Sequence, residues 1–343
     1  MSHEPIASAS TFDHLVDLAA ASVGGKALWA TDDFFAPKEN LLKPGRGVFI
    51  PGKYTENGKW MDGWESRRKR TPGHDVCLVK LGLPGTISGV DIDTNHFTGN
   101  YPEHASIEVC EAPANASVEQ LLSNEFAWRE ALPISKLAGG SRNLFDTSDT
   151  KRVTHLKLHI HPDGGVARLR VHGHVLPDWK QASTADGLVD LAAITNGAAI
   201  AGTNDQYFGR GDQLIYPGDP ANMGEGWETQ RKRAPGNDWI VVRLASAGMI
   251  KKVEIHTTHF KGNFPDRCSL EGTVLPPGTL PNYLGSRSIA WQALLPQTKL
   301  SEDAKHNFDS ELRASGPFTH VRLSIYPDGG VARLRLFGTR SEE

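Results

Sequence analysis

The sequence predicts an all-β protein made of two antiparallel β-sandwiches in tandem, with only short helices. Three features lead to this expectation. One long block of sequence occurs twice in the 343 residues. Short apolar or alternating runs are separated by Gly- and Pro-rich turns, and helical periodicity is almost absent. The composition, 38% hydrophobic and 22% charged, is typical of globular proteins, and each half is long enough to bury its own core.

The repeated block is the strongest of these features. It starts at Asp62 in the first copy and at Glu225 in the second. The offset of 163 residues (225 − 62) holds without a gap as far as Glu108, and about half of the positions are identical. Chance does not explain a match of this length, so the chain contains a duplicated structural unit.

The repeats extend beyond this block. The sequence Leu-Val-Asp-Leu-Ala-Ala at 15–20 returns at 188–193. We therefore expect one domain over residues 1–178 and a second over 183–343. The polar, Pro-containing segment at 176–183 is a typical linker between domains.

The elements before the block are taken in chain order. Residues 10–21 have apolar positions at helical spacing after a serine hydroxyl, which predicts a short amphipathic helix. Thr31-Asp-Asp33 aligns with Thr203-Asn-Asp205 in the second copy. The first copy then carries an insertion of about ten residues around Val48–Met61, which we expect to form a surface loop.

The block itself predicts strands. Residues 75–81 and their counterparts at 238–244 are apolar and β-branched. The runs 87–92 and 250–255 follow, and Asn-, Gly- and Pro-rich turns close them. Runs of this composition and length are typical of β-strands.

The end of each repeat resembles a β-hairpin. Residues 155–161 alternate strictly between apolar and polar, Pro162-Asp-Gly-Gly165 turns the chain, and 166–172 alternate again. The second copy repeats this pattern at 320–336. Before it, the first copy holds a helix-like segment at 117–122, within a region that differs between the copies.

Charge and cysteine content limit the partners and the compartment. The net charge is −3 and the pI is about 6.5, so we expect neither nucleic acid nor a membrane surface as partner. Cys77, Cys110 and Cys268 have no cysteine counterpart in the other copy, which argues for a reducing compartment. The N-terminus does not resemble a signal peptide, and no apolar run approaches the roughly 18 residues of a membrane span. We expect a cytoplasmic protein.

Both copies contain the run Arg-Lys-Arg, which provides the arginines Arg68, Arg70, Arg231 and Arg233. One interpretation is a solvated basic loop. The other is capture of an anion, because a guanidinium binds a carboxylate through two parallel hydrogen bonds that a lysine cannot reproduce. Retention of both arginines in two otherwise diverged copies favours the second interpretation.

A Trp-Glu pair precedes each basic run and provides Glu65 and Glu228. A structural interpretation pairs each carboxylate with the neighbouring cations. A functional one makes it an acceptor for the N–H groups of a ligand, or a general base.

A shared turn follows the next strand and contains His96 and Asn100 in the first copy, and His259 and Asn263 in the second. The glycine and proline of the turn are explained by its geometry alone. A histidine in this position is either a structural residue or a proton donor. The asparagines are candidate ligand-binding residues.

No cofactor or metal is expected from the motifs. The sequence contains no zinc, EF-hand, glycine-rich phosphate or Gly-x-Ser-x-Gly pattern. His155, His159 and His161 alternate along one predicted strand, but the second copy repeats only the first of them, as His320. A duplicated metal site is therefore not predicted, although a divalent metal without a recognisable motif stays open.

These motifs resemble the allantoicase family, over nearly the whole chain. The resemblance rests on three motifs that both copies contain in the same order. They are Gly-Trp-Glu-Ser/Thr-x-Arg-Lys-Arg-x-Pro-Gly-x-Asp, Asn/Thr-His-Phe-x-Gly-Asn-Tyr/Phe-Pro and Pro-Asp-Gly-Gly-Val-Ala-Arg-Leu-Arg. The resemblance implies two jelly-roll repeats, a homo-oligomer, and hydrolysis of allantoate to ureidoglycolate and urea in purine (allantoin) breakdown.

The candidate residues fit this substrate, a carboxylate on a carbon that bears two ureido groups. The arginines would bind the carboxylate, and the glutamates and asparagines would accept the ureido N–H groups. His96 or His259 would be the general acid, and Glu65 or Glu228 the general base. Two arrangements are open: each sandwich holds a site, or one site forms where copies or subunits meet. The competing hypothesis is a non-catalytic jelly-roll protein that binds a small ligand or carbohydrate.

Overall fold

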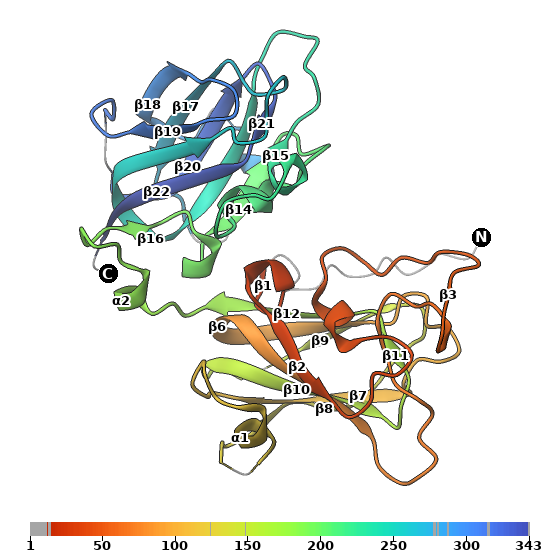
Figure 1. Ribbon diagram of the computed structural model, residues 1–343. Coiled ribbons are helices and arrows are strands. Elements are labelled where there is room, and N and C mark those ends of the chain that lie inside the picture. Colours follow the sequence, from red (N-terminus) through yellow and green to blue (C-terminus); the bar gives the residue numbers. More distant parts are fainter. Residues whose placement is uncertain are drawn as a thin grey trace, which may run out of the picture. The chain divides into compact units, whose positions relative to one another are not determined.

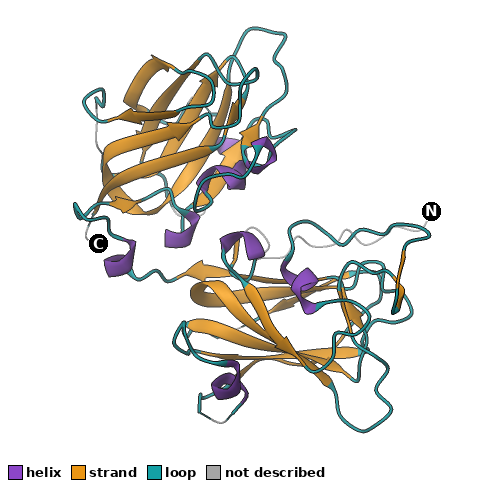
Figure 2. Ribbon diagram, viewed as in Figure 1, coloured by secondary structure: helices purple, strands orange, loops and turns teal. Residues whose placement is uncertain are grey.

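The computed structural model describes residues 12, 15–123, 125–147, 149–276, 279, 281–286, 288–313 and 316–341. The chain forms two compact units, Met1–Leu176 (unit 1) and Pro177–Glu343 (unit 2). Strands dominate both units, as Figures 1 and 2 show. The prediction of an all-β protein with short helices is confirmed.

Unit 1 has an eight-stranded antiparallel sheet in the order β1-β12-β6-β10-β7-β8, and β2 and β9 also pair with β6. Its strands are β1 (Val16–Asp17), β2 (Lys26–Ala30), β6 (Asp75–Asp93), β7 (His104–Cys110), β8 (Arg129–Lys136), β9 (Arg142–Asp146), β10 (Val153–His161) and β12 (Arg168–Val175). Two small two-stranded sheets accompany it. They pair β5 (Trp64–Glu65) with β11 (Gly165–Val166), and β3 (Tyr54–Thr55) with β4 (Gly58–Lys59).

Unit 2 repeats this topology in the order β13-β22-β16-β20-β17-β18, with β14 and β19 also paired to β16. Its strands are β13 (Val189–Asp190), β14 (Ala199–Thr203), β16 (Asp238–His256), β17 (Arg267–Thr273), β18 (Gln292–Lys299), β19 (Lys305–Phe308), β20 (Phe318–Tyr326) and β22 (Arg333–Arg340). The small sheet of β15 (Trp227–Glu228) and β21 (Gly330–Val331) corresponds to that of β5 and β11.

Helices are short throughout the described residues. The α-helices are α1 (Val118–Leu122) and α2 (Trp179–Ala182). The 3-10 turns are η1 (Ala21–Val23), η2 (Lys38–Leu42), η3 (Ile194–Asn196), η4 (Gly211–Ile215), η5 (Met223–Glu225) and η6 (Pro281–Tyr283). None of these helices has the length and apolar character that a membrane crossing requires.

One long strand in each unit connects the two layers of the sandwich. In unit 1 the first part of β6, residues 75–80, pairs with β2 and β10. The second part, residues 85–93, pairs with β12 and β9. The two halves therefore belong to different layers, and apolar side chains from both fill the core between them. The two strands predicted at 75–81 and 87–92 are the two halves of this one strand.

The predicted hairpin is wrong in both units. Residues 155–161 lie in β10 and residues 166–172 lie mainly in β12, but β6 lies between these two strands. The connecting residues 165–166 instead form β11 and pair with β5. Period-2 alternation predicts that a segment is a strand, but it does not identify the neighbouring strand. Here the chain crosses between layers where the sequence suggested a tight turn.

The predicted helix over residues 10–21 is also wrong where the structure describes it. Residues 10, 11, 13 and 14 lie outside the described part. Val16–Asp17 forms strand β1, paired with β12. The Asp17 carboxylate accepts the Val171 N–H over 3.0 Å, so contacts with a distant strand determine this conformation in place of local helical spacing.

Two local predictions are confirmed. The segment 117–122 forms α1, whose N-terminus has a capping box between Ser117 and Gln120. The insertion at 48–61 is a surface loop that carries the β3–β4 pair, and its Tyr54 side chain is 72% exposed.

Candidate active site

Two buried tryptophans position the candidate glutamates. Trp64 and Trp227 are fully buried, and their indole N–H groups donate to the carbonyl oxygens of Asp32 and Asp205, each over 2.8 Å. These bonds attach β5 and β15 to the preceding loops and leave the next residue, the glutamate, half-buried at the surface. They also correct the sequence alignment, since Asp205 corresponds to Asp32 and not to Asp33.

Each glutamate is hydrogen-bonded to the asparagine of the shared turn. Asn100 Nδ2 donates to Glu65 Oε1 over 2.7 Å, and Asn263 Nδ2 donates to Glu228 Oε1 over 2.5 Å. Burial raises the pKa of Glu65 above its ordinary value, while the Asn100 hydrogen bond and the charge of Lys59 oppose the increase. Residues that the sequence suggested separately, 35 positions apart, thus form one polar pair in each unit.

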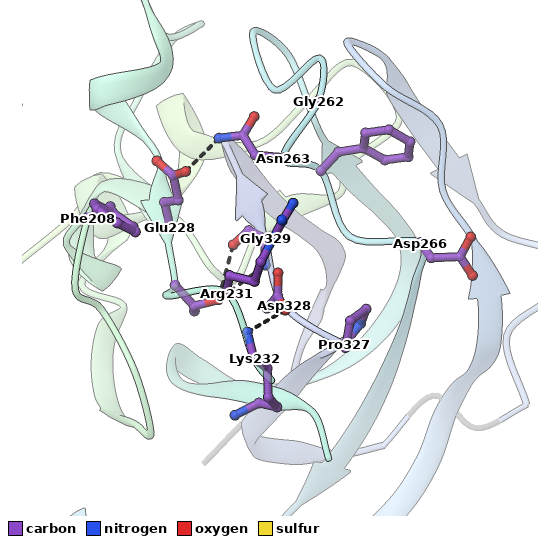
Figure 3. Close-up of a pocket in the computed structure, with 12 residues that line it drawn as sticks. Phe208, Glu228, Arg231, Lys232, Gly262, Asn263, Asp266, Pro327, Asp328 and Gly329 are labelled. Atoms are coloured by element: carbon purple, nitrogen blue, oxygen red, sulfur yellow. Dashed lines mark hydrogen bonds between the residues drawn. The ribbon is translucent and has the colours of Figure 1, made fainter. Parts of the chain in front are cut away.

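In unit 2 this pair lines a pocket of about 490 Å³, within the range of small-molecule sites. Figure 3 shows the side chains of Glu228 and Asn263 pointing toward one another, with the Arg231 side chain beside them. The pocket is lined by Phe208, Glu228, Thr229, Arg231, Lys232, Gly262, Asn263, Phe264, Asp266, Pro327, Asp328 and Gly329.

Unit 1 contains an equivalent set of residues at the corresponding positions. The two sets are identical except at three places, where Ser66, Tyr101 and Glu103 replace a threonine, a phenylalanine and an aspartate. The unit 1 set is Phe35, Glu65, Ser66, Arg68, Lys69, Gly99, Asn100, Tyr101, Glu103, Pro162, Asp163 and Gly164. The duplication has therefore preserved the chemistry of the whole pocket wall, and not only the residues of one motif.

The lysine of each Arg-Lys-Arg run is structural. Lys232 Nζ forms an ion pair of 2.8 Å with the fully buried Asp238, and the Lys232 N–H donates to Asp328 Oδ2 over 2.7 Å. Lys69 makes the same ion pair, of 2.7 Å, with Asp75 in unit 1. These contacts hold the run against the sheet.

The arginines on either side of that lysine are exposed. Arg231 lines the unit 2 pocket, and Arg68 takes the corresponding position in unit 1. Arg233 is not among the residues around the pocket, and Arg70 corresponds to it. In unit 2 the structure therefore brings one arginine of the run to the Glu-Asn pair.

Both candidate histidines have a strained backbone, and His259 lies outside the lining of the unit 2 pocket. His96 and His259 have φ values of 67° and 70°, a left-handed conformation that residues other than glycine adopt rarely. The His259 ring Nε2 donates to the carbonyl of Pro220 over 3.0 Å. The centre of the His96 ring lies 5.8 Å from that of Phe49. Their role as general acids stays a prediction.

The pocket wall contains residues to which the sequence analysis gave no role, chiefly Phe208, Lys232 and Asp328. Lys232 and Asp328 are 96 positions apart and meet only because β21 pairs with β15. These residues are repeated in the other copy, and this could have been seen in the sequence. Repetition alone, however, does not show whether a residue lines a pocket or only forms a turn.

Comparisons with known proteins find the same duplication of the chain. Residues 16–176 and 189–341 each match the family model described as an allantoicase repeat. The chain is 50% identical over 335 residues to probable allantoicase 2 of Burkholderia pseudomallei strain K96243, which covers 98% of this chain and 97% of the relative. The chain belongs to the allantoicase family. A probable allantoicase of Ralstonia nicotianae is 49% identical, over 94% of both chains.

Solved structures of allantoicases have the same fold. The crystal structure of allantoicase from Saccharomyces cerevisiae superposes with a TM-score of 0.79, at 33% identity, over 94% of this chain and 93% of that one. A second allantoicase structure gives a TM-score of 0.80, at 32% identity. The predicted family, the fold of two jelly-roll repeats and the assignment as an allantoicase enzyme are confirmed.

Two other kinds of site, a metal centre and a thiolate nucleophile, find little support among the described residues of this chain. The described residues contain no group of three or more His, Cys, Asp or Glu side chains placed to hold a metal ion. Burial raises the thiol pKa of Cys110 to about 11 and that of Cys268 to about 12, so both thiols are protonated at neutral pH. A thiolate nucleophile from either residue is therefore not part of the site.

Proposed function

We propose that this chain hydrolyses allantoate to ureidoglycolate and urea, in the breakdown of allantoin. The observation that carries the proposal is the unit 2 pocket, where Glu228, Asn263 and Arg231 surround one cavity. Membership of the allantoicase family supports the same reaction.

The polar groups of the pocket complement the substrate. The Arg231 guanidinium binds the substrate carboxylate through a two-pronged hydrogen bond. The Asn263 amide already donates to Glu228, so its own carbonyl oxygen and the second carboxylate oxygen of Glu228 are acceptors for ureido N–H groups. The pocket thus provides a cation for the anionic end and acceptors for the donor-rich end.

The reaction needs one water molecule and two proton transfers. The water oxygen forms a bond to the central carbon, the bond from that carbon to one ureido nitrogen breaks, and the nitrogen leaves as urea after taking a proton. Glu228 is positioned to accept the proton from water. Once protonated, Glu228 can return that proton to the leaving nitrogen. His259 donates to Pro220 and must leave that carbonyl before it can act as the acid, so Glu228 is the better-placed donor.

We propose that each unit carries one such site. Glu65, Asn100 and Arg68 repeat the unit 2 residues, and the Glu-Asn hydrogen bond is present in both. The burial that raises the pKa of Glu65 strengthens it as a proton acceptor.

The cellular setting is part of the same proposal. The protein would act in the cytoplasm as a homo-oligomer, without nucleic-acid or membrane partners. The net charge of −3 gives no electrostatic basis for binding anionic polymers, and Cys77, Cys110 and Cys268 are free and buried. Light scattering of the purified protein would give the subunit number.

The test is release of urea from allantoate by purified protein, before and after exhaustive chelation. Urea with equimolar ureidoglycolate is the expected result, and it should survive chelation. Loss of activity that a divalent ion restores would replace the acid–base mechanism with a metal-dependent one. Absence of urea from folded protein would favour the non-catalytic ligand-binding alternative.

A further inference from the structure

Unit 1 contains a loop that unit 2 lacks. The offset between the repeats falls from 173 at residues 15–20 to 163 at Asp62, so the segment before Asp62 is ten residues longer than its counterpart (173 − 163). We call Val48–Met61 the inserted loop. It is folded onto itself through β3 and β4, and the Trp60 N–H donates to the Lys53 carbonyl over 3.1 Å.

The inserted loop packs against the wall of the unit 1 site. Asn57 Nδ2 donates to the Phe34 carbonyl over 2.8 Å. A Cβ atom added at Gly58 would lie 3.9 Å from the ring of Phe35, the residue that corresponds to the pocket residue Phe208. The tip of the loop is therefore held beside the aromatic residue that borders the site.

The loop also brings a cation to the Glu-Asn pair. The charge of Lys59 lowers the pKa of Glu65 against the effect of burial, so the two groups are close enough to interact electrostatically. Lys59 Nζ lies 4.5 Å from the centre of the Phe49 ring, and that ring lies 5.8 Å from the ring of His96. Lys59 therefore interacts with the charge of Glu65 and packs on the Phe49 ring, which neighbours the candidate histidine.

We propose that Lys59 is a specificity-determining residue of unit 1, where its ammonium group binds the carboxylate of a substrate seated on Glu65 and Asn100. This inference rests on the proposed hydrolysis of allantoate. Unit 1 then has two cations for the substrate carboxylate, Lys59 and Arg68, whereas the shorter loop of unit 2 brings no such lysine. The two sites of one chain would differ in affinity, with unit 1 the tighter.

The physical consequence is a change in KM with little change in kcat. The substrate carboxylate keeps its charge throughout the reaction, so a cation that binds it stabilises the ground state and the transition state alike. An interaction of this uniform kind lowers KM and leaves kcat unchanged. Loss of a hydrogen bond to a charged group should raise KM about 10- to 100-fold.

The test uses the full chain with unit 2 silenced by Glu228→Gln. In that background, at a pH on the plateau above the acidic limb of Glu65, Lys59→Met should raise KM for allantoate about 10- to 100-fold, with kcat within about threefold. The matched control is Lys53→Met, because Lys53 lies on the same loop with Nζ 3.9 Å above the Trp60 ring. KM should stay within about twofold in this control, since an exposed cation away from the site contributes little.

Two outcomes would overturn the inference. One is an unchanged KM in Lys59→Met, and the other is an equal increase in Lys53→Met, which would indicate a general effect of loop charge. If the wild-type protein releases no urea, the proposed function fails and allantoate binding by titration calorimetry becomes the readout. Lys59 keeps its proposed role only if Lys59→Met weakens that binding about tenfold or more and Lys53→Met does not.

Discussion

Removal of the Asn100 amide should raise the pKa of Glu65 and move the pH dependence of the unit 1 site. Asn100 Nδ2 donates to Glu65 Oε1 over 2.7 Å, which stabilises the carboxylate relative to the protonated acid. Burial already raises this pKa, and the hydrogen bond is one of two influences that oppose it. The variant Asn100→Leu removes that influence, so the pKa has to increase further.

The magnitude follows from the geometry. A hydrogen bond to a charged group contributes about 1.5–3 kcal/mol. Glu65 is only half-buried, so screening by water reduces the contribution to about 1 kcal/mol. One pKa unit corresponds to about 1.36 kcal/mol, and the expected increase is therefore about 0.7 unit.

The assay is the pH dependence of kcat/KM for allantoate in the Glu228→Gln background, where unit 1 alone supports turnover. A general base acts as the carboxylate, so activity increases with pH through the pKa of Glu65. In Asn100→Leu the acidic limb should move about 0.7 unit to higher pH. The same substitution at Asn263 should not move it. An acidic limb that stays in place in Asn100→Leu would refute Glu65 as the base.

Three further predictions concern stability and the histidines. Lys232→Met leaves the buried Asp238 without its ion-pair partner and should lower the free energy of unfolding in urea by about 3–5 kcal/mol. The exposed Arg233→Met control should change it by less than about 0.5 kcal/mol, and equal losses would contradict the structural role of the lysine. In a Glu65→Gln background, where unit 2 alone supports turnover, His259→Gly relieves a left-handed backbone and should keep kcat within about threefold, whereas a loss of about 10²–10⁴ in a folded variant would establish the ring as a general acid. Burial lowers the pKa of His155 to about 4 from 6.5, so the unfolded chain binds more protons in this window. The melting temperature should therefore fall as pH decreases from 6.5 toward 4, and a flat profile, or one unchanged in His155→Gln, would count against this explanation.

The sequence predicted the parts of the fold that depend on local pattern. The duplicated block, the strands in the two halves of β6 and the capped helix α1 were all visible in residue spacing. The pairing of β10 with β6 and not with β12 was not visible, because alternation carries no information about which strand lies alongside. Contacts between residues distant in sequence decided it.

The candidate site, like the fold, could be predicted only as far as local sequence motifs determine it. Glu228, Asn263 and Arg231 were identified from their motifs, and the fold brings them to one pocket. His259 was expected with them but lies outside the lining, since its left-handed backbone directs the ring to Pro220. A turn motif gives the spacing of its residues along the chain, but the direction of each side chain depends on its backbone torsion angles.

The measurement that tests the central claim most directly compares urea release from allantoate by the wild-type chain, Glu65→Gln, Glu228→Gln and the double variant. If each unit carries a site with a glutamate base, each single variant keeps part of the activity. The double variant should lose about 10²- to 10⁴-fold in kcat while it stays folded. A folded double variant with wild-type kcat would contradict the account, because neither Glu-Asn pair would then take part in the reaction.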